Sequence, residues 1–225
     1  MNTSTLLRKI PHGFGTKADG DGRNPETLHH ILQEDGISYK RIIKPRQTHG
    51  THVEIVSVAS SENPMADGLV TKSSEVVLTV LTADCVPIMY YDPKSSVIGI
   101  SHGGWKGTLD KIPQKVIESM QSLGSKVQNI RVSIGPSIGS CCYEIYGERK
   151  TLFLERFSSA VFAEKSDNTY LDLQDANRES LLETGILPQN IELITTCTSC
   201  SDASFFSFHR DKCIRGEMTS FISLD

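Results

Sequence analysis

Three β-rich segments follow one another directly in the middle of the chain, and few folds can accommodate them. They read VVLTVLTADC (76–85), VPIMYY (86–91) and VIGISHGGW (97–105), with DPKSS as a turn before the third. β-Branched and aromatic residues favour strands, whereas Asp, Pro and Ser favour turns. Because no helix separates these strands, a doubly wound parallel sheet is disfavoured. The pattern predicts an α+β fold in which mixed β-sheets are flanked by helices.

Helices and further strands are predicted on both sides of this block. An amphipathic helix follows the third strand, with Thr108 as its N-cap and Gly124 as its end. Its apolar face consists of Ile112, Val116, Ile117, Met120 and Leu123. Two more helices are predicted over 147–157 and 172–185. Other strands are predicted over 41–44, 52–58, 68–71, 130–135, 191–195 and 217–224. The stretch 12–26 is rich in Gly, Asp and Asn, which predicts a mobile surface loop.

Length and charge narrow the class of protein. A chain of 225 residues can form one sizeable core, so a single domain over 1–225 is predicted. The formal net charge of -4 gives no general attraction to nucleic acid or to acidic membranes, and neither is expected as a partner. No run approaches the roughly 20 apolar residues of a membrane span, and the first residues lack a signal-peptide pattern. A cytoplasmic location with reduced cysteines is therefore expected.

Three residues in glycine- or proline-punctuated segments have the chemistry of a catalytic site. They are His49 in QTHG, Cys85 in TADCVP and His102 in SHGGWKG. Two imidazoles and a thiolate can bind a borderline divalent metal, and three protein ligands leave a fourth position open, as in catalytic zinc sites. A thiol next to an imidazole can also act as a nucleophile. The spacing is compatible with both chemistries.

The other cysteines are interpreted as packing residues. Cys197 and Cys200 form a CxxC pair, which is typical of redox sites or of half a zinc site. Cys141 and Cys142 are adjacent, and adjacent side chains of an extended chain point to opposite faces and chelate one ion poorly. These four residues and Cys213 are therefore assigned to packing.

Residues near the trio have either structural or binding interpretations. Asp84 is interpreted as a turn cap in preference to a carboxylate that orients a histidine. Trp105 is interpreted as a wall or core residue in preference to a stacking platform for substrate. Gln47 can stabilise a turn, and its place beside His49 also suits a hydrogen bond to substrate. His209 lies beside Arg210 and can enter the pocket.

Eight ordered motifs resemble the bacterial YfiH family, also called the DUF152 or laccase-domain family and formerly multicopper polyphenol oxidoreductases. The motifs are QTHG, ADGLVT, LTADCVP, SHGGWKG, IGPSIGSCCYEI, LDL with its following DAN, CTSC and FFSFHRD. The resemblance runs from His12 nearly to the C-terminus. It differs from the usual pattern at Lys17, Lys106 and His209, where the family commonly has arginine.

The resemblance implies a fold, an activity and a set of site residues. The fold is the α+β architecture shared with cytotoxic-necrotizing-factor-like cysteine hydrolases. The activity is zinc-dependent phosphorolysis of adenosine, inosine, guanosine and 5′-methylthioadenosine by inorganic phosphate, together with adenosine deamination. The implied metal ligands are His49, Cys85 and His102, and Cys85 and His102 also match the catalytic pair of the toxin-like hydrolases. As fixed cations, Lys106 and Arg210 are assigned to phosphate, and Gln47 to substrate.

Three alternatives stay open at this point. The first is a metal-free hydrolase or deamidase that uses Cys85 and His102. The second is a copper polyphenol oxidase, suggested by the family's older name, although one set of three ligands does not supply the His-rich clusters that multicopper chemistry needs. The third is a non-enzymatic domain that contains zinc and binds a protein partner.

Overall fold

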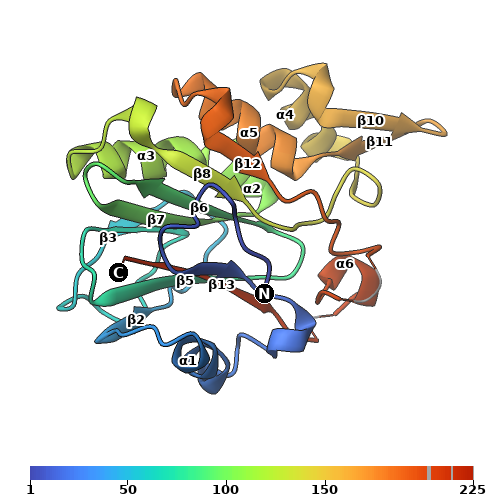
Figure 1. Cartoon of the computed structure of the whole chain (residues 1–225). Helices are drawn as coiled ribbons and strands as arrows, with labels where there is room; N and C mark the ends of the chain where they lie inside the picture. Colours follow the sequence, from blue (N-terminus) through green and yellow to red (C-terminus); the bar gives the residue numbers. More distant parts are fainter. Residues whose placement is uncertain (202–203, 214, 225) are drawn as a thin grey trace.

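Two β-sheets lie face to face between two layers of helices in the computed structural model of the chain (Figure 1). Helix α1 (Pro25–Glu34) covers the outer side of one sheet. Helices α3 (Ile112–Ser122) and α5 (Leu173–Glu183) cover the outer side of the other sheet. The structure describes residues 1–201, 204–213 and 215–224. The predicted helices and strands therefore combine into a four-layer stack.

The smaller of these two sheets carries the two ends of the described chain. Its strands are, in spatial order, β1 (His12–Phe14), β13 (Met218–Ser223), β5 (Val76–Thr82) and β2 (Arg41–Ile43). Strand β13 is antiparallel to both of its neighbours, whereas β2 is parallel to β5. Leu32 of α1 packs with Val77 and Phe221 on the outer face. The N- and C-terminal segments thus pair next to the central strand β5.

The larger sheet contains the two strands that the predicted DPKSS turn connects. Its strands are, in spatial order, β12 (Ile191–Leu193), β8 (Arg131–Ile134), β6 (Val86–Asp92), β7 (Val97–Gly103), β4 (Gly68–Thr71) and β3 (Val53–Ile55). Strands β6 and β7 are antiparallel, and the pair Asp92 and Val97 closes the turn predicted from DPKSS. The outer pairs β12–β8 and β3–β4 are parallel. This is the mixed sheet that the sequence predicts.

Alternate side chains of β6 enter two different cores. Ile88 and Tyr90 pack beneath the helices, whereas Met89 and Tyr91 pack between the two sheets. Successive side chains of a strand point to opposite faces, so a strand that is apolar on both faces must be covered on both. The continuous apolar character of VPIMYY therefore requires cover on both faces of the strand, which the helices and the second sheet provide.

Shorter elements complete the structure. The remaining helices are α2 (Trp105–Leu109), α4 (Gly147–Arg156) and α6 (Phe208–Asp211), with 3-10 turns at Lys17–Asp19, Val127–Asn129, Ser159–Val161 and Pro188–Asn190. A small third sheet has the order β10 (Phe162–Lys165), β11 (Asn168–Leu171) and β9 (Glu144–Ile145). Within the described ranges, every helix is too short or too polar to cross a bilayer.

Two local predictions were wrong. The stretch 12–26 is not simply a loop, because His12–Phe14 pairs with β13 and Asn24 caps α1 by accepting from the backbone N–H of Glu26. The helix predicted to start after Thr108 starts instead at Ile112. Lys111 has a left-handed backbone with φ 59°, which ends one helical segment and starts the next. The predicted helices over 147–157 and 172–185 are confirmed as α4 and α5.

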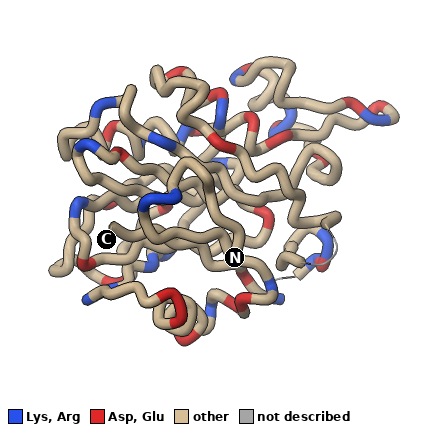
Figure 2. Tube along the Cα trace, viewed as in Figure 1, with Lys and Arg blue, Asp and Glu red and all other residues tan. Residues whose placement is uncertain are grey.

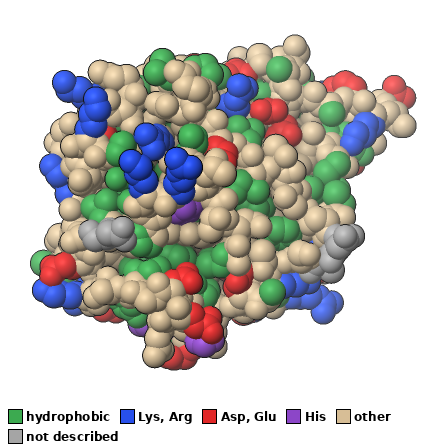
Figure 3. All heavy atoms as spheres, in the orientation of Figure 1, with side chains coloured by type: hydrophobic (Ala, Val, Ile, Leu, Met, Phe, Trp, Pro, Cys, Tyr) green, Lys and Arg blue, Asp and Glu red, His purple; other side chains and the backbone are tan. Residues whose placement is uncertain are grey.

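Charges of both signs are mixed along the chain. Figure 2 shows Lys and Arg interspersed with Asp and Glu, and Figure 3 shows apolar side chains between the charged groups on the same face. This mixing agrees with the small net charge of -4.

Glu192 ties the N-terminal segment to the edge strand β12. Its carboxylate accepts hydrogen bonds from the hydroxyls of Ser4 and Thr5 and from the backbone N–H groups of Thr5 and Leu6. Burial alone would raise the pKa of Glu192, but these hydrogen bonds outweigh burial and lower it. A carboxylate with a lowered pKa stabilises the folded state above its unfolded pKa, and this contribution is lost as the pH falls.

Glu192→Gln is expected to lower the free energy of unfolding by about 1 kcal/mol at pH 7, after allowance for solvent screening. The difference from wild type should be smaller at pH 3, because protonation of Glu192 begins to remove the same charge from wild type. Urea denaturation at both pH values measures this. Glu155→Gln, on the exposed side of α4, is the control and should have little effect. An equal loss at both pH values would contradict the electrostatic explanation.

Candidate active site

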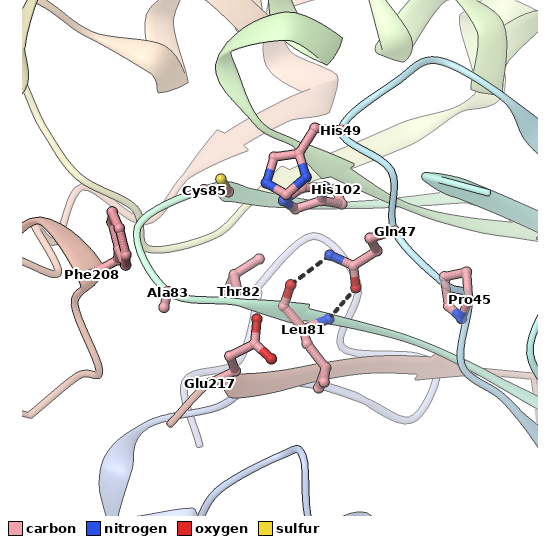
Figure 4. A pocket seen from close by; sticks show the side chains of 10 residues that line it. All are labelled: Pro45, Gln47, His49, Leu81, Thr82, Ala83, Cys85, His102, Phe208 and Glu217. Atoms are coloured by element: carbon pink, nitrogen blue, oxygen red, sulfur yellow. Dashed lines mark hydrogen bonds between the residues drawn. The ribbon is translucent and has the colours of Figure 1, made fainter. Parts of the chain in front are cut away.

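The three residues of the predicted trio converge although they are far apart in sequence. His49 lies in the loop after β2, Cys85 lies where the chain passes from β5 to β6, and His102 is on β7. Their ligand atoms all lie within 4.8 Å of one another. The rings of His49 and His102 meet edge to face, with centroids 4.7 Å apart. Figure 4 shows the three side chains pointing toward one another at one end of a pocket.

The position of Cys85 follows from the packing of the two sheets. Strand β5 belongs to the smaller sheet and β6 to the larger one, so the intervening residues must cross between them. Asp84 makes this sharp crossing with a φ of 90°. In the antiparallel pair β6–β7, Pro87 of β6 lies opposite His102 of β7. The start of β6 therefore lies against the end of β7. The thiol and the imidazole are therefore positioned by the strand register.

Asp67 organises the site and was not identified from the sequence. Its carboxylate is fully buried. One oxygen accepts from the backbone N–H of His49 and from Nδ1 of His102, each at 2.9 Å. The other accepts from the backbone N–H groups of Thr48 at 3.0 Å and Gly50 at 2.8 Å, and from the Thr48 hydroxyl. One carboxylate thus shapes the His49 loop and fixes the orientation of His102.

The hydrogen bond to Asp67 also decides which nitrogen of His102 is available. Because Nδ1 donates its proton to the carboxylate, Nε2 remains for the site. The only sequence signal for Asp67 is its place in the motif ADGLVT, directly before β4. Asp84, which was considered for the orienting role, has a different one and is described below.

The charges in the site act strongly on one another. Burial opposes ionisation of Cys85, but the charge and hydrogen bond of His102, together with a hydrogen bond from His49, lower the Cys85 pKa to about 6. Burial would likewise lower the pKa of His102, but the Cys85 thiolate and the Asp67 carboxylate raise it to about 9. Hydrogen bonds hold the Asp67 pKa well below its usual range despite burial. Without a bound metal, the site therefore favours a thiolate beside an imidazolium at neutral pH.

The trio forms one end of a pocket with a volume of about 490 Å³. This volume lies within the range of about 300–1,000 Å³ that is typical of sites for small organic molecules. Besides the trio, the pocket is lined by Pro45, Gln47, Leu81, Thr82, Ala83, Phe208 and Glu217. Phe208 and Glu217 were not singled out from the sequence. Burial is the main cause that raises the pKa of the Glu217 carboxyl.

Gly104 leaves the space in which the three ligand side chains meet. A Cβ atom at this position would lie 3.0 Å from Cδ2 of His49, and 3.4 Å from both Sγ of Cys85 and Cε1 of His102. The backbone at Gly104 has φ -72°, which any residue can adopt. A side chain at this position would therefore crowd the ligands, although the backbone conformation would allow one.

Gly104→Ala is expected to weaken zinc binding by about 10-fold or more, since ligand geometry must be held within about 0.5 Å. The free energy of unfolding of the metal-free protein should fall by about 1 kcal/mol, because glycine is a much better helix N-cap than alanine. Zinc titration and thermal denaturation of the metal-free protein test the two parts separately. Unchanged zinc affinity would show that the neighbouring side chains can move aside.

Gln47 lines the pocket, as the prediction of a substrate contact requires. Its amide pairs with the main chain of Leu81, with Nε2 donating to the Leu81 carbonyl at 2.8 Å and Oε1 accepting from the Leu81 N–H at 2.8 Å. Figure 4 shows this pair of hydrogen bonds. Gln47 therefore also joins the loop before His49 to strand β5.

The two cations assigned to phosphate lie outside this pocket lining. Lys106 is exposed, with Nζ 5.4 Å from the centroid of the Trp105 ring. The guanidinium of Arg210 donates to Asp211 at 2.9 Å and to the carbonyls of Phe205 at 3.0 Å and Thr198 at 3.2 Å. Among the described residues, neither cation lines the pocket that contains the trio.

Asp84 connects three loops next to the site. Its carboxylate accepts from the Thr198 hydroxyl at 2.6 Å and from the backbone N–H of His209 at 2.7 Å. Its main-chain carbonyl accepts from the N–H of Ile138 at 2.9 Å. The preferred interpretation of Asp84 as a turn residue agrees with this geometry. These contacts link the residues before Cys85 to the segments that contain Ile138, Thr198 and His209.

The trio fits a zinc ion. Its donor set is two imidazoles and a thiolate, which suits zinc better than it suits a hard cation such as Mg²⁺. The orientation of His102 is set by a carboxylate, as in many zinc sites. The pocket extends from one side of the trio, where substrate or water can approach.

The assignment of the other cysteines to packing holds only in part. Cys142 and Cys197 pack against the core beneath the helices, whereas Cys141, Cys200 and Cys213 are exposed. The sulfur atoms of Cys141, Cys142, Cys197 and Cys200 all lie within 4.8 Å of one another. The expectation that Cys141 and Cys142 point apart assumed an extended chain. They lie instead in a turn in which the N–H of Cys142 donates to the carbonyl of Gly139. A turn can direct adjacent side chains to one point.

Comparison with known proteins gives consistent matches. A sequence model of the family described as multi-copper polyphenol oxidoreductase laccase matches residues 16–225. Purine nucleoside phosphorylase LACC1 of Mus musculus is 35% identical over 204 residues, which are 88% of this chain and 47% of the mouse protein. The chain therefore spans about half the length of this relative. Adenosine deaminase RL5, from an unknown prokaryotic organism, is 33% identical over 80% of this chain and 74% of RL5.

Solved structures match over nearly the whole fold. The crystal structure of YlmD from Geobacillus stearothermophilus superimposes with a TM-score of 0.88 at 28% sequence identity. The match covers 98% of this chain and 94% of YlmD. The predicted α+β fold with mixed sheets is thereby confirmed.

Proposed function

Since the chain belongs to the multi-copper polyphenol oxidoreductase laccase family, we propose that it is a zinc-dependent purine nucleoside phosphorylase that also deaminates adenosine. Membership confirms the resemblance to the YfiH family that the ordered motifs indicate. The names of the mouse relative and of RL5 support the two activities. The observation that carries the proposal is the convergence of His49, Cys85 and His102 at the end of a pocket of about 490 Å³.

The proposed substrates are adenosine, inosine, guanosine and 5′-methylthioadenosine, with inorganic phosphate as the second substrate. Phe208, which is 53% exposed, offers an apolar ring against which a purine can stack. Leu81 and Pro45 form part of an apolar pocket wall. The polar side chains of the pocket include the trio and Glu217. A purine nucleoside has the same division between an apolar face and polar edges.

Zinc held by His49, Cys85 and His102 would polarise an oxygen of phosphate or of water and lower the pKa of such a water to about 7. The chain's own residues supply the positioning. Asp67 keeps Nε2 of His102 directed at the site and holds the loop of His49 through backbone hydrogen bonds. Gly104 leaves the space in which the three ligands meet.

Glu217 is proposed to move the proton in phosphorolysis. In this reaction a phosphate oxygen forms a bond to the anomeric carbon, the bond from that carbon to the purine nitrogen breaks, and the leaving purine takes up a proton. The raised pKa of Glu217 keeps a fraction of this carboxyl protonated closer to neutral pH than usual. The carboxyl gives its proton to the purine and recovers one from hydrogen phosphate.

The two cations have separate proposed roles. Lys106 is exposed on the short helix that follows the His102 strand, and its flexible ammonium group can reach toward an incoming phosphate. Arg210 contributes by fixing α6, because its guanidinium donates to the carbonyls of Thr198 and Phe205. Since α6 begins at Phe208, this positions the ring in the pocket.

Glu217→Gln is expected to lower kcat for inosine phosphorolysis by about 10²–10⁴-fold, the usual contribution of a general acid. In wild type, activity should decline as the pH rises through the Glu217 pKa, and the variant should lose this limb of the pH profile. The variant should fold with equal or greater stability, because a half-buried carboxyl with a raised pKa destabilises the folded state at neutral pH. Unchanged kcat would exclude this role.

The proposed function is tested by product analysis. Zinc-loaded protein should convert inosine to hypoxanthine and ribose 1-phosphate only when phosphate is present, and adenosine to inosine when phosphate is absent. Removal of zinc by a chelator should abolish both reactions, and added zinc should restore them. Formation of products that is independent of both phosphate and zinc would contradict the proposal.

A second candidate function is supported by the sequence of contacts from Cys85 through His102 to Asp67. This arrangement matches that of cysteine hydrolases, in which a carboxylate orients the histidine. The thiolate would attack an amide carbon, His102 would protonate the departing amine, and water would then cleave the thioester. Such activity would persist after chelation and be abolished by alkylation of Cys85, whereas the zinc-dependent activity requires the metal.

Copper oxidation remains less well supported. The copper reading rests on the family name. Among the described residues, the second group suited to a metal contains four cysteines and no histidine, whereas multicopper oxidation requires further histidine-rich sites.

A further inference from the structure

Four cysteines outside the active site meet at the junction of two loops. Cys141 and Cys142 lie between β8 and β9, and Cys197 and Cys200 follow β12. The two loops run side by side, since Ser137 pairs with Cys197 in a parallel bridge. All four sulfur atoms lie within 4.8 Å of one another, and those of Cys141 and Cys200 are 3.4 Å apart.

We propose that these four cysteines form a second metal site, a closed tetrahedral zinc site that fastens the two loops together. A zinc–sulfur bond of about 2.3 Å places the sulfur atoms of a tetrahedral site about 3.8 Å apart. The Cys141–Cys200 separation of 3.4 Å is slightly below that value, and the upper limit of 4.8 Å on all the separations lies above it, so the cluster has the size of such a site.

Hydrogen-bond donors lie beside the four sulfur atoms. The backbone N–H of Gly139 donates to Sγ of Cys197 at 3.4 Å. The ammonium group of Lys165 donates to the carbonyls of Ser140 and Cys141. Four thiolates around Zn²⁺ carry a net charge of about -2, and these donors partly neutralise it.

Two simpler explanations account for less of the arrangement. Packing against the core explains Cys142 and Cys197 but not Cys141 and Cys200, which are exposed. A disulfide between Cys141 and Cys200 would use only two of the sulfur atoms and would leave the convergence of Cys142 and Cys197 unexplained. Four thiol ligands from two turns, one of them a CxxC, are typical of structural zinc sites.

The proposed zinc site is connected to the active site through Thr198 and Asp84. Thr198, within the CxxC, donates its backbone N–H to the carbonyl of Ser137 at 3.0 Å and its hydroxyl to the carboxylate of Asp84 at 2.6 Å. Asp84 directly precedes Cys85. A metal that fixes the CxxC therefore also fixes the crossing that positions the active-site thiol. This second site is closed and structural, whereas the first is open.

Zinc content of purified variants tests the proposal. After incubation with zinc and removal of excess metal, wild type should retain two equivalents per chain, and Cys197→Ser and Cys85→Ala should retain one each. The double variant should retain none. Cys213→Ser, which replaces an exposed cysteine outside the cluster, is the matched control and should retain two. A Cys197→Ser protein that still binds two equivalents would overturn the proposal.

The zinc count separates this inference from the proposed function. If the active site binds no zinc, Cys85→Ala retains the same metal as wild type while Cys197→Ser loses one equivalent. Intact mass measurement identifies the disulfide alternative, because oxidation of a cysteine pair lowers the mass by two hydrogens and blocks thiol reagents. Finding that disulfide in protein purified under reducing conditions and supplied with zinc would overturn the proposal.

Cobalt substitution covers the case in which Cys197→Ser does not fold. Wild type loaded with Co²⁺ should show strong thiolate-to-cobalt charge-transfer bands, and Cys200→Ser, at an exposed position, should lose a large part of that absorption. Affinity at this site should fall by about 100-fold or more, since even the loss of a residue that only orients a ligand costs 10–100-fold. Absorption that is identical in Cys200→Ser and wild type would contradict the assignment.

Discussion

Cys85→Ala is expected to lower kcat/KM for inosine phosphorolysis by about 10³-fold or more, which corresponds to about 4 kcal/mol of transition-state stabilisation. The substitution removes the thiolate between His49 and His102 and leaves two ligands for zinc. Two imidazoles hold zinc weakly, so the variant should also lose its active-site metal. Steady-state rates of ribose 1-phosphate formation, together with zinc analysis of the same samples, measure both effects.

The control for this experiment is Cys213→Ser, which changes a thiol that lies outside both cysteine sites. It should keep both rate and metal content. The free energy of unfolding of the metal-free protein should also fall in Cys85→Ala, because the substitution removes the thiolate that pairs with the His102 imidazolium. Phosphate-dependent turnover that survives in Cys85→Ala would contradict the assignment of the active site. Lost turnover with zinc retained would instead favour a nucleophilic role for Cys85.

Asp67→Asn is expected to be the most damaging of the conservative substitutions near the site. It keeps the shape of the side chain but replaces one acceptor oxygen by an NH₂ group. Because both carboxylate oxygens accept from N–H donors, the new NH₂ must face at least one of them. The free energy of unfolding should fall by about 3 kcal/mol, the cost of disrupting a buried charged network.

Zinc affinity in Asp67→Asn should fall by 10–100-fold, because His102 loses the acceptor that orients it. The measurements are urea denaturation of the metal-free protein and zinc titration. The hydrogen bonds hold the pKa of Asp67 below its unfolded value, so its stabilising contribution is complete at pH 7 and is lost as the pH falls below about 4. Asp35→Asn, at an exposed helix end, is the control. Wild-type stability and zinc affinity in Asp67→Asn would show that Asp67 has no organising role.

The fold was largely predictable where local chemistry and burial agree. Strands β5, β6 and β7 have β-branched sequences that tertiary packing also requires, and α5 begins and ends where its capping residues predict. Helix α1 was missed because it directly follows a glycine-rich stretch. Its apolar residues, such as Leu28 and Leu32, are explained only by the sheet that they cover.

The candidate site was predictable to different degrees. His49, Cys85 and His102 carry side chains that can bind a metal, so residue type and motif were sufficient to bring them together as a hypothesis. Asp67 was missed because its importance comes from five donors that meet it only in the folded chain. Lys106 and Arg210 were chosen by charge alone, and charge does not tell which way a side chain is turned.

The sequence by itself therefore determined the class of fold, the family and the three residues of the proposed zinc site, because periodicity and side-chain chemistry are local properties. Only the tertiary structure decided that Asp67 orients His102, that Glu217 and Phe208 line the pocket, and that four cysteines meet at a second point. These contacts join residues that are tens of positions apart. They depend on strand register and on the directions of turns, which are set by the packing of the two sheets and their helices.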